Sequence, residues 1–450
     1  MHKYMRLLNE LERQIREGTY KEGDKLPSVR ELAVRYGCNV GTVVRALNEL
    51  EKQHEVYAVA KSGYYVVKQE AGGETAKPEQ LDFIASAPDP DMFPYLDFRH
   101  CINKAIDTYR NELFVYGTAK GLPSLMPAVR KHLTDHQVFV PESRIFITSG
   151  VQQALSVLAS IPFPNGKRTI LIEQPGYHLF VEQLETLGLP AVGIRRTAAG
   201  IDTDELERLF RTGDIKFFYT MSRFHSPLGS SYSEAQKKKI ARLAARYDVY
   251  IVEDDYLADL ETNAKSDPIY AYDEDAKVIY LKSYSKIIFP GLRIGVAVLP
   301  EPLAGPFARH KKLVDIDSSM LSQAALEIYL KSGMFERHRD KIRALCDKRA
   351  RLLASAVSRY AATGEMAFRF PAPEPPAIHT HLVLDPRIAV GPLASRLKKR
   401  GILVEPIDKH YMTGFPRERI LKLNASNVKE SDIDRGVGAI MEEIERGLRL

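Results

Sequence analysis

From about residue 81 onward, short apolar runs alternate along the chain with amphipathic segments of helical periodicity, such as 234–247. We expect strands at 145–148, 169–172, 217–220, 249–252, 278–281 and 294–299. Short buried strands that alternate with helices are typical of a mainly parallel α/β sheet. The sequence therefore predicts a large α/β domain in this part of the chain.

The chain after about residue 335 has a different pattern, with long charged helical segments and short strands at 381–384 and 420–423. This pattern indicates a smaller α+β lobe at 335–450, within one domain that runs from 81 to 450. A chain of 450 residues is also too long for a single compact core, so we expect at least two domains.

The first 68 residues have the pattern of a separate, small unit. Ser28 and Glu31 have the spacing of a capping box at the start of a short helix, and a second helix follows at 40–52. Two short strand-like runs, 55–60 and 64–68, then form a hairpin. With the amphipathic N-terminal helix, this is the order of a winged helix-turn-helix.

Residues 69–80 have the composition of a linker, because they consist largely of Gly, Ala, Glu, Lys and Pro and contain no large apolar residue. The expected organisation is a winged helix-turn-helix at 1–68, a linker at 69–80 and an α/β domain at 81–450.

The bulk composition excludes several other classes of protein. Cys38, Cys101 and Cys346 are far apart and in no C-x-x-C arrangement, so we expect no disulfide framework, no metal site and a reducing cytoplasm. No apolar stretch is long enough for a membrane span, and the N-terminus lacks the apolar core of a signal peptide. The net charge of +6 is compatible with a polyanionic partner but does not indicate one.

The string GDKLPSVRELA at 23–33, with Thr42-Val43 in the next helix, resembles the GntR type of winged helix. The resemblance implies a double-stranded DNA operator as partner, whereas a winged helix that binds protein is the alternative. The DNA contacts expected on this basis are Ser28, Arg30, Asn39, Gly41, Thr42, Arg45, Lys61 and Tyr64. Ser28 and Arg30 start a helix and suit a phosphate, although Arg30 could instead pair with guanine.

Two short segments of the expected winged helix depart from the GntR pattern. Asn39-Val40 stands where the GntR type has Ser-Arg, and the wing reads Lys-Ser-Gly-Tyr rather than Gly-Ser-Gly-Thr.

Four segments of the second domain, each after an expected strand, resemble the fold-type I aminotransferases. They are Ser149 to Leu155, Glu173 to Tyr177, Val252 to Tyr256, and Ser283 to Lys286 with Phe289 to Gly295. The ends of parallel strands meet at one edge of a sheet, where such folds bind ligands. The resemblance covers about 81–450 and implies pyridoxal 5'-phosphate (PLP) as cofactor.

The resemblance also implies a role for each residue. Lys286 would carry the cofactor, Asp254 would face the pyridinium nitrogen with Asp255 as the alternative, and Tyr177 would stack on the ring. Tyr256 would bond the phenolic oxygen. The phosphate contacts would be Gly150, Val151, Gln152, Ser283, Ser285 and Arg293, with Tyr116 reaching the phosphate of a partner subunit.

Three positions on the substrate side depart from the aminotransferase pattern. Leu179 stands where some relatives have an Arg two positions after the stacking tyrosine. Ser226 stands where the family has an Asn, so His225 or water could replace it. Lys422 stands where the family has an Arg that binds the substrate carboxylate, and a lysine lacks the planar fork of a guanidinium. The other cations that could serve are Arg369, Arg387 and Arg417.

Together the two halves resemble the MocR type, GntR-like regulators with an aminotransferase-like domain. We therefore expect a homodimeric, PLP-binding transcriptional regulator that senses the cofactor or a small amine or amino-acid-like effector, without net turnover. The alternatives are an active aminotransferase with an accessory DNA-binding domain, and a PLP-free scaffold in which Lys286 is structural.

Overall fold

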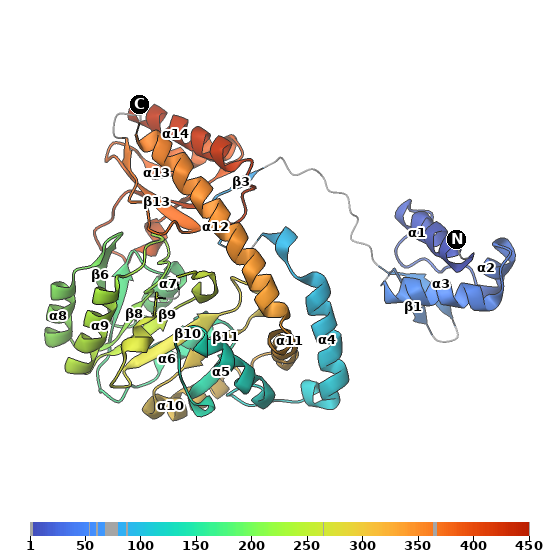
Figure 1. The fold of residues 1–450 in the computed structure, drawn as a ribbon, viewed down its shortest axis with the longest axis horizontal. Helices are drawn as coiled ribbons and strands as arrows, with labels where there is room; N and C mark the ends of the chain where they lie inside the picture. The colour runs from blue at the N-terminus through green and yellow to red at the C-terminus, as the bar shows by residue number, and fades with distance from the viewer. Residues whose placement is uncertain are drawn as a thin grey trace. The chain divides into compact units, whose positions relative to one another are not determined.

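The computed structural model describes residues 3–53, 55–59, 62–67, 80–86, 89–263, 265–362 and 367–449. Contacts divide the chain into two units, 1–78 and 79–450 (Figure 1). Residues 69–79 of the predicted linker lie outside the described residues, and so does Lys61.

The first unit is a winged helix-turn-helix, as predicted. Its helices are α1 (Lys3–Arg16), α2 (Val29–Arg35) and α3 (Val40–Lys52), and its wing is the antiparallel pair β1 (Val56–Val59) and β2 (Gly63–Val66). The expected capping box is present, because the Ser28 side chain accepts from the Glu31 N–H while Glu31 accepts from the Ser28 N–H. The helices share a core that includes Leu11, Leu32 and Leu47.

The second unit contains a sheet of eight strands in the order β4-β11-β10-β9-β8-β5-β6-β7. The strands are β4 (Ile145–Thr148), β5 (Thr169–Gln174), β6 (Ala191–Thr197), β7 (Gly200–Ile201), β8 (Ile215–Thr220), β9 (Tyr250–Asp254), β10 (Val278–Ser283) and β11 (Gly295–Val298). Neighbours from β10 through β6 are parallel, whereas β11 runs antiparallel to both β10 and β4. The predicted mainly parallel α/β sheet is confirmed.

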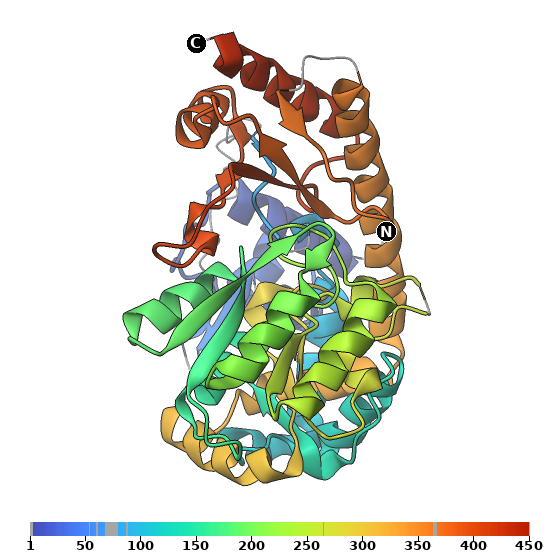
Figure 2. The same ribbon diagram turned by 90° about the vertical axis from the view of Figure 1, so that its left-hand side faces the viewer.

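Helices surround this sheet (Figures 1 and 2). They are α4 (Tyr95–Tyr109), α5 (Met126–Thr134), α6 (Val151–Ser160), α7 (His178–Thr186), α8 (Thr203–Thr212), α9 (Glu234–Arg246), α10 (Glu301–Val314) and α11 (Met320–Lys331). The 3-10 helices are Pro90–Met92, Arg110–Phe114, Pro123–Leu125, Glu142–Arg144, Ala258–Leu260, Ile269–Tyr272, Pro290–Leu292 and Asp408–His410. No described helix combines the length and apolar character that crossing a membrane requires.

The smaller lobe has a four-stranded sheet in the order β12-β13-β16-β15, drawn in orange and red in Figure 2. Its elements are α12 (Met334–Ala361), β12 (Phe368–Arg369), β13 (His379–Leu384), α13 (Val390–Lys399), β14 (Ile402–Leu403), β15 (Glu405–Pro406), β16 (Ile420–Asn424) and α14 (Ile433–Arg449). Helix α12 joins the two lobes, because Ile342 packs in the core of the large lobe and Leu353 in that of the small lobe.

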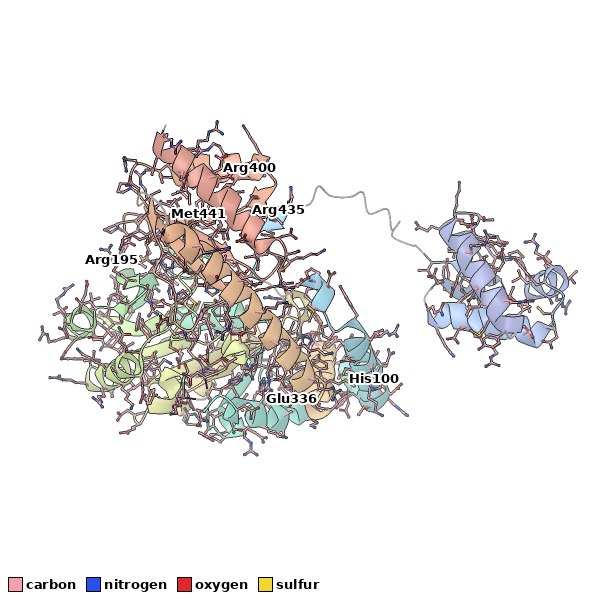
Figure 3. The ribbon with its side chains drawn as sticks, turned by 45° about the horizontal axis from the view of Figure 1, so that its top comes forward. His100, Arg195, Glu336, Arg400, Arg435 and Met441 are labelled. Atoms are coloured by element: carbon pink, nitrogen blue, oxygen red, sulfur yellow. The ribbon has the colours of Figure 1, made fainter. Side chains whose placement is uncertain are left out.

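Helix α14 has one face in the core of the small lobe and one face at its surface. Met441 is buried in the core, whereas Arg400 at the end of α13 donates to Glu442 and Glu443 (Figure 3). The start of the second unit also joins this lobe, because β3 (Leu81–Asp82) pairs with β14 in parallel. This pairing places the segment after β3, including Ser86, close to β16.

Candidate cofactor site and DNA-binding surface

A cavity at the carboxyl ends of the central strands brings together most of the predicted cofactor residues. Its lining includes Gly150, Val151, Gln152, Tyr177, Asp254, Tyr256, Ser283, Ser285, Lys286 and Arg293. They converge because β4, β5, β9 and β10 end at the same edge of the sheet. Tyr116 does not line this cavity and is 80% exposed.

Asp254 is buried, and only one of its carboxylate oxygens is satisfied. Oδ2 accepts a hydrogen bond from the Tyr219 hydroxyl at 2.9 Å, while Oδ1 has no hydrogen-bond partner among the described residues. Burial raises the pKa of Asp254 to about 7. A buried, unpartnered carboxylate oxygen at a cavity suits a cationic ring nitrogen, which would favour the ionised carboxylate.

Asp255, the alternative ligand, points elsewhere. Its carboxylate accepts hydrogen bonds from Arg223, with Nε at 3.0 Å, and from the Tyr280 hydroxyl at 2.7 Å. The guanidinium of Arg223 holds the pKa of Asp255 below its usual value against the effect of burial. The geometry therefore favours Asp254 over Asp255 as the group that faces a ligand in the cavity.

Lys286 carries its amine in the same cavity. Burial lowers the pKa of this amine to about 8, and the nearby positive charge of Lys422 acts in the same direction. A lowered pKa increases the fraction of neutral amine near pH 7, which is the nucleophilic form.

Gly150 and Arg293 form the cup that suits an anion. Gly150 has φ +92° and caps α6, and a Cβ at this position would lie 2.9 Å from Arg293 Nη2. The same nitrogen donates to the Ser149 carbonyl at 2.9 Å. Backbone N–H groups at the start of a helix, a guanidinium and the hydroxyls of Ser283 and Ser285 together suit a phosphate.

Of the residues expected near the phenolic oxygen of the cofactor, Tyr256 already has a hydrogen-bond partner in the protein. The Tyr256 hydroxyl donates to the Phe224 carbonyl at 3.0 Å, and Ser226 lines the cavity. His225 is fully buried and is not among the described residues that line the cavity. Its Nε2 lies 3.4 Å from Glu173 Oε2. Of the two protein groups considered for the role of the family's Asn, only Ser226 faces the cavity.

The substrate side of the cavity has one lysine and two residues that the sequence did not single out. Lys422 Nζ lies 3.7 Å from Glu405 Oε2 and 3.5 Å from Ser86 Oγ. Ser86 and His178 also line the cavity. His178 could have been found as the neighbour of Tyr177, whereas only the β3–β14 pairing places Ser86 here.

None of Arg369, Arg387 and Arg417 is among the described residues that line this cavity. Arg387 pairs with Asp385, while Arg369 and Arg417 lie beside a separate surface hollow. These three residues, considered as replacements for the family's carboxylate-binding Arg, do not reach the site.

In the winged helix, several predicted DNA contacts also have structural partners. Asn39 Oδ1 accepts from both the Thr42 N–H at 2.7 Å and the Thr42 hydroxyl at 2.8 Å. The Arg45 guanidinium lies 4.2 Å from the centroid of the Tyr4 ring.

The wing is tied to α3 by Tyr64, whose hydroxyl donates to Asn48 Oδ1 at 3.2 Å. Ser28, Arg30 and Gly41 are exposed. Most of the predicted contacts thus lie on α3 and at the start of α2.

Each of the two units matches a known protein family. Residues 91–440 match the family of class I and II aminotransferases, and residues 3–66 match the bacterial regulatory proteins of the gntR family. The uncharacterized HTH-type transcriptional regulator YcxD of Bacillus subtilis (strain 168) is 57% identical over 99% of this chain and 100% of that protein. The chain belongs to the MocR type of transcriptional regulator.

More distant relatives of this MocR-type chain include the uncharacterized HTH-type transcriptional regulator YdcR of Escherichia coli (strain K12), 26% identical over 80% of this chain and 82% of that protein. Among solved structures, the multiple substrate aminotransferase of Thermococcus profundus has a TM-score of 0.74 at 24% identity, covering 83% of this chain and 93% of that chain. At this identity the likeness shows the fold alone.

Proposed function

We propose that this MocR-type regulator binds DNA through its winged helix and binds PLP in its second unit, where it senses the cofactor or a small amine effector. The convergence of Gly150, Asp254, Lys286 and Arg293 on one cavity is the observation that carries this proposal. The boundaries proposed for the parts are 1–68, 69–80 and 81–450.

The donor set fits PLP at each of its polar groups. Arg293, Ser283, Ser285 and the backbone at the start of α6 would hold the phosphate, and Asp254 would face the ring nitrogen. Lys286 would hold the cofactor covalently through its amine. Bound PLP would supply an aldehyde that can hold an amine covalently and a ring that withdraws electrons from it.

Asp254, Lys286 and Tyr177 would have separate roles toward the cofactor. The carboxylate of Asp254 would favour the protonated form of the ring nitrogen, and the partly neutral amine of Lys286 would be the nucleophile that holds the cofactor. The Tyr177 ring lies at the cavity wall and excludes water from one face of a planar ligand.

Effector recognition is weaker than in a typical aminotransferase. Lys422 offers a point charge, and Glu405 lies beside it. We therefore favour a sensor over an active aminotransferase. An effector switches DNA binding only if it stabilises one arrangement of the two units more than another.

We further propose a homodimer on paired operator half-sites. Phe114, Val115 and Tyr116 are 74%, 63% and 80% exposed, which is a large apolar exposure for three consecutive residues. A second copy of the chain would cover them and bring Tyr116 to the phosphate of its partner.

Genome-wide footprinting with and without PLP tests the regulator proposal. We expect discrete protected sites whose occupancy changes with PLP for the natural chain, and protection that no longer responds to PLP for Lys286→Ala. The absence of protected sites in both conditions would refute the DNA-binding function. Steady release of a keto acid from an amino donor by the purified protein would instead support the aminotransferase alternative.

A further inference from the structure

The first turn of α3 presents apolar atoms to solvent. Val40 is 51% exposed and is followed by an exposed glycine, Gly41. The buried face of α3 is formed by other residues, Val43, Ala46, Leu47 and Leu50. Neither Val40 nor Gly41 belongs to the core of the described winged helix, so folding does not account for this surface.

Gly41 has no steric reason to be glycine within the described part of the chain. A Cβ at this position would meet only Asn39 Oδ1, at an ordinary contact distance of 3.6 Å. Glycine inside a helix is less stable than alanine, because it loses more conformational freedom on folding. Folding therefore does not require glycine at this position in the first turn of α3, and the missing side chain leaves room for a molecule to approach the helix closely.

The polar groups around this turn leave little for reading a base by paired hydrogen bonds. Asn39 Oδ1 already accepts two hydrogen bonds from Thr42, so Asn39 can only donate, through its amide nitrogen. Arg45 packs on the Tyr4 ring, and residues 36–44 contain no Lys or Arg. The bidentate pairing of arginine with guanine is thus not available from the first turn of α3.

We propose that Val40 contacts the C5-methyl group of a thymine in each operator half-site, and that Gly41 lets this base edge come close to the helix. The proposal rests on the DNA-binding function proposed above. The thymine methyl is the apolar group that the major groove of unmodified DNA offers, and an exposed valine at the start of a recognition helix complements it.

The test uses the full-length protein and an operator fragment defined by footprinting. Each thymine of a half-site is replaced in turn by uracil, which removes only the methyl group. We expect one position at which the Kd rises about fourfold, because the complex no longer buries one methyl-sized group. The other thymines serve as internal controls.

Val40→Ala should weaken binding to the thymine fragment and lose the sensitivity to uracil at that position, because the two changes remove the two sides of one contact. Val34→Ala is the matched control, since Val34 is 85% exposed but lies on α2. It should keep the full sensitivity to uracil.

Gly41→Ala should leave the melting temperature equal or higher while weakening operator binding, because the added methyl stabilises the helix but blocks close approach. Sensitivity to uracil that persists unchanged in Val40→Ala, or uracil scanning without any effect, would overturn the inference while DNA binding stands. Failure of the protein to bind any footprinted fragment would overturn the DNA-binding function, and this inference with it.

Discussion

Replacing Asp254 by asparagine should change stability and PLP affinity in opposite directions. Burial raises the pKa of Asp254 from 3.8 to about 7, and this difference corresponds to about 4 kcal/mol of extra cost for ionising the carboxyl in the folded protein. Between these two pH values the native state binds more protons than the unfolded state. The stability of the PLP-free protein therefore falls as the pH rises through this range, and the full loss is present at pH 8.

Asparagine removes this cost at pH 8 and keeps an oxygen that accepts from the Tyr219 hydroxyl. Its amide nitrogen takes the place of the unpartnered Oδ1, and an unsatisfied buried polar group costs about 1–3 kcal/mol. The net expectation for the PLP-free variant is a gain of about 1–3 kcal/mol at pH 8. At pH 5 the natural Asp254 is largely neutral, so the variant should be equal to it or less stable.

The affinity for PLP should fall by about thirtyfold or more at pH 8, because removing one partner of a buried charge pair costs about 2–5 kcal/mol. Melting of the PLP-free protein at pH 5 and pH 8, and absorbance titration with PLP, measure the two effects. Asp255→Asn is the control, since it breaks the buried pair with Arg223 and should destabilise at both pH values. An Asp254→Asn variant that is less stable at pH 8, or that binds PLP normally, would refute the reasoning.

Three further expectations concern single residues. The rate at which PLP attaches to Lys286, measured by stopped-flow absorbance, should rise with pH around a midpoint near pH 8. Borohydride reduction should fix the cofactor to the natural chain but not to the Lys286→Ala variant. Gly150→Ala should weaken PLP binding about tenfold or more in an absorbance titration, because the new Cβ strains the backbone and pushes on Arg293; unchanged affinity would contradict the proposed cup. Tyr64→Phe should destabilise the winged helix by about 0.5–1.5 kcal/mol through the lost bond to Asn48, seen as a lower melting temperature that Tyr57→Phe should not reproduce.

The residues that the sequence assigned to a cofactor line one cavity because each of their motifs follows a strand. Gly150 and Arg293 are far apart in the chain, yet they meet because β4 and β11 are neighbours in the sheet. Strand β6 was missed, since only Ile194 and Arg196 are buried in it and its apolar run is short. Ser86 could not be predicted, because no local pattern shows that β3 pairs with β14, which is more than 300 residues away.

In the proposed function, the pairing of Lys422 with Glu405 would make the effector side of the cavity bind more weakly than the cofactor side. Glu405 on β15 lies opposite Lys422 in register, and its carboxylate opposes the lowering of the Lys422 pKa by burial. A ligand carboxylate would have to compete with Glu405 for a single ammonium group. We therefore expect a smaller free energy of binding on the effector side, whereas Arg293 and Asp254 have no comparable competing ion pair among the described residues. Weak, reversible capture of this kind suits a protein whose DNA binding follows the concentration of a ligand.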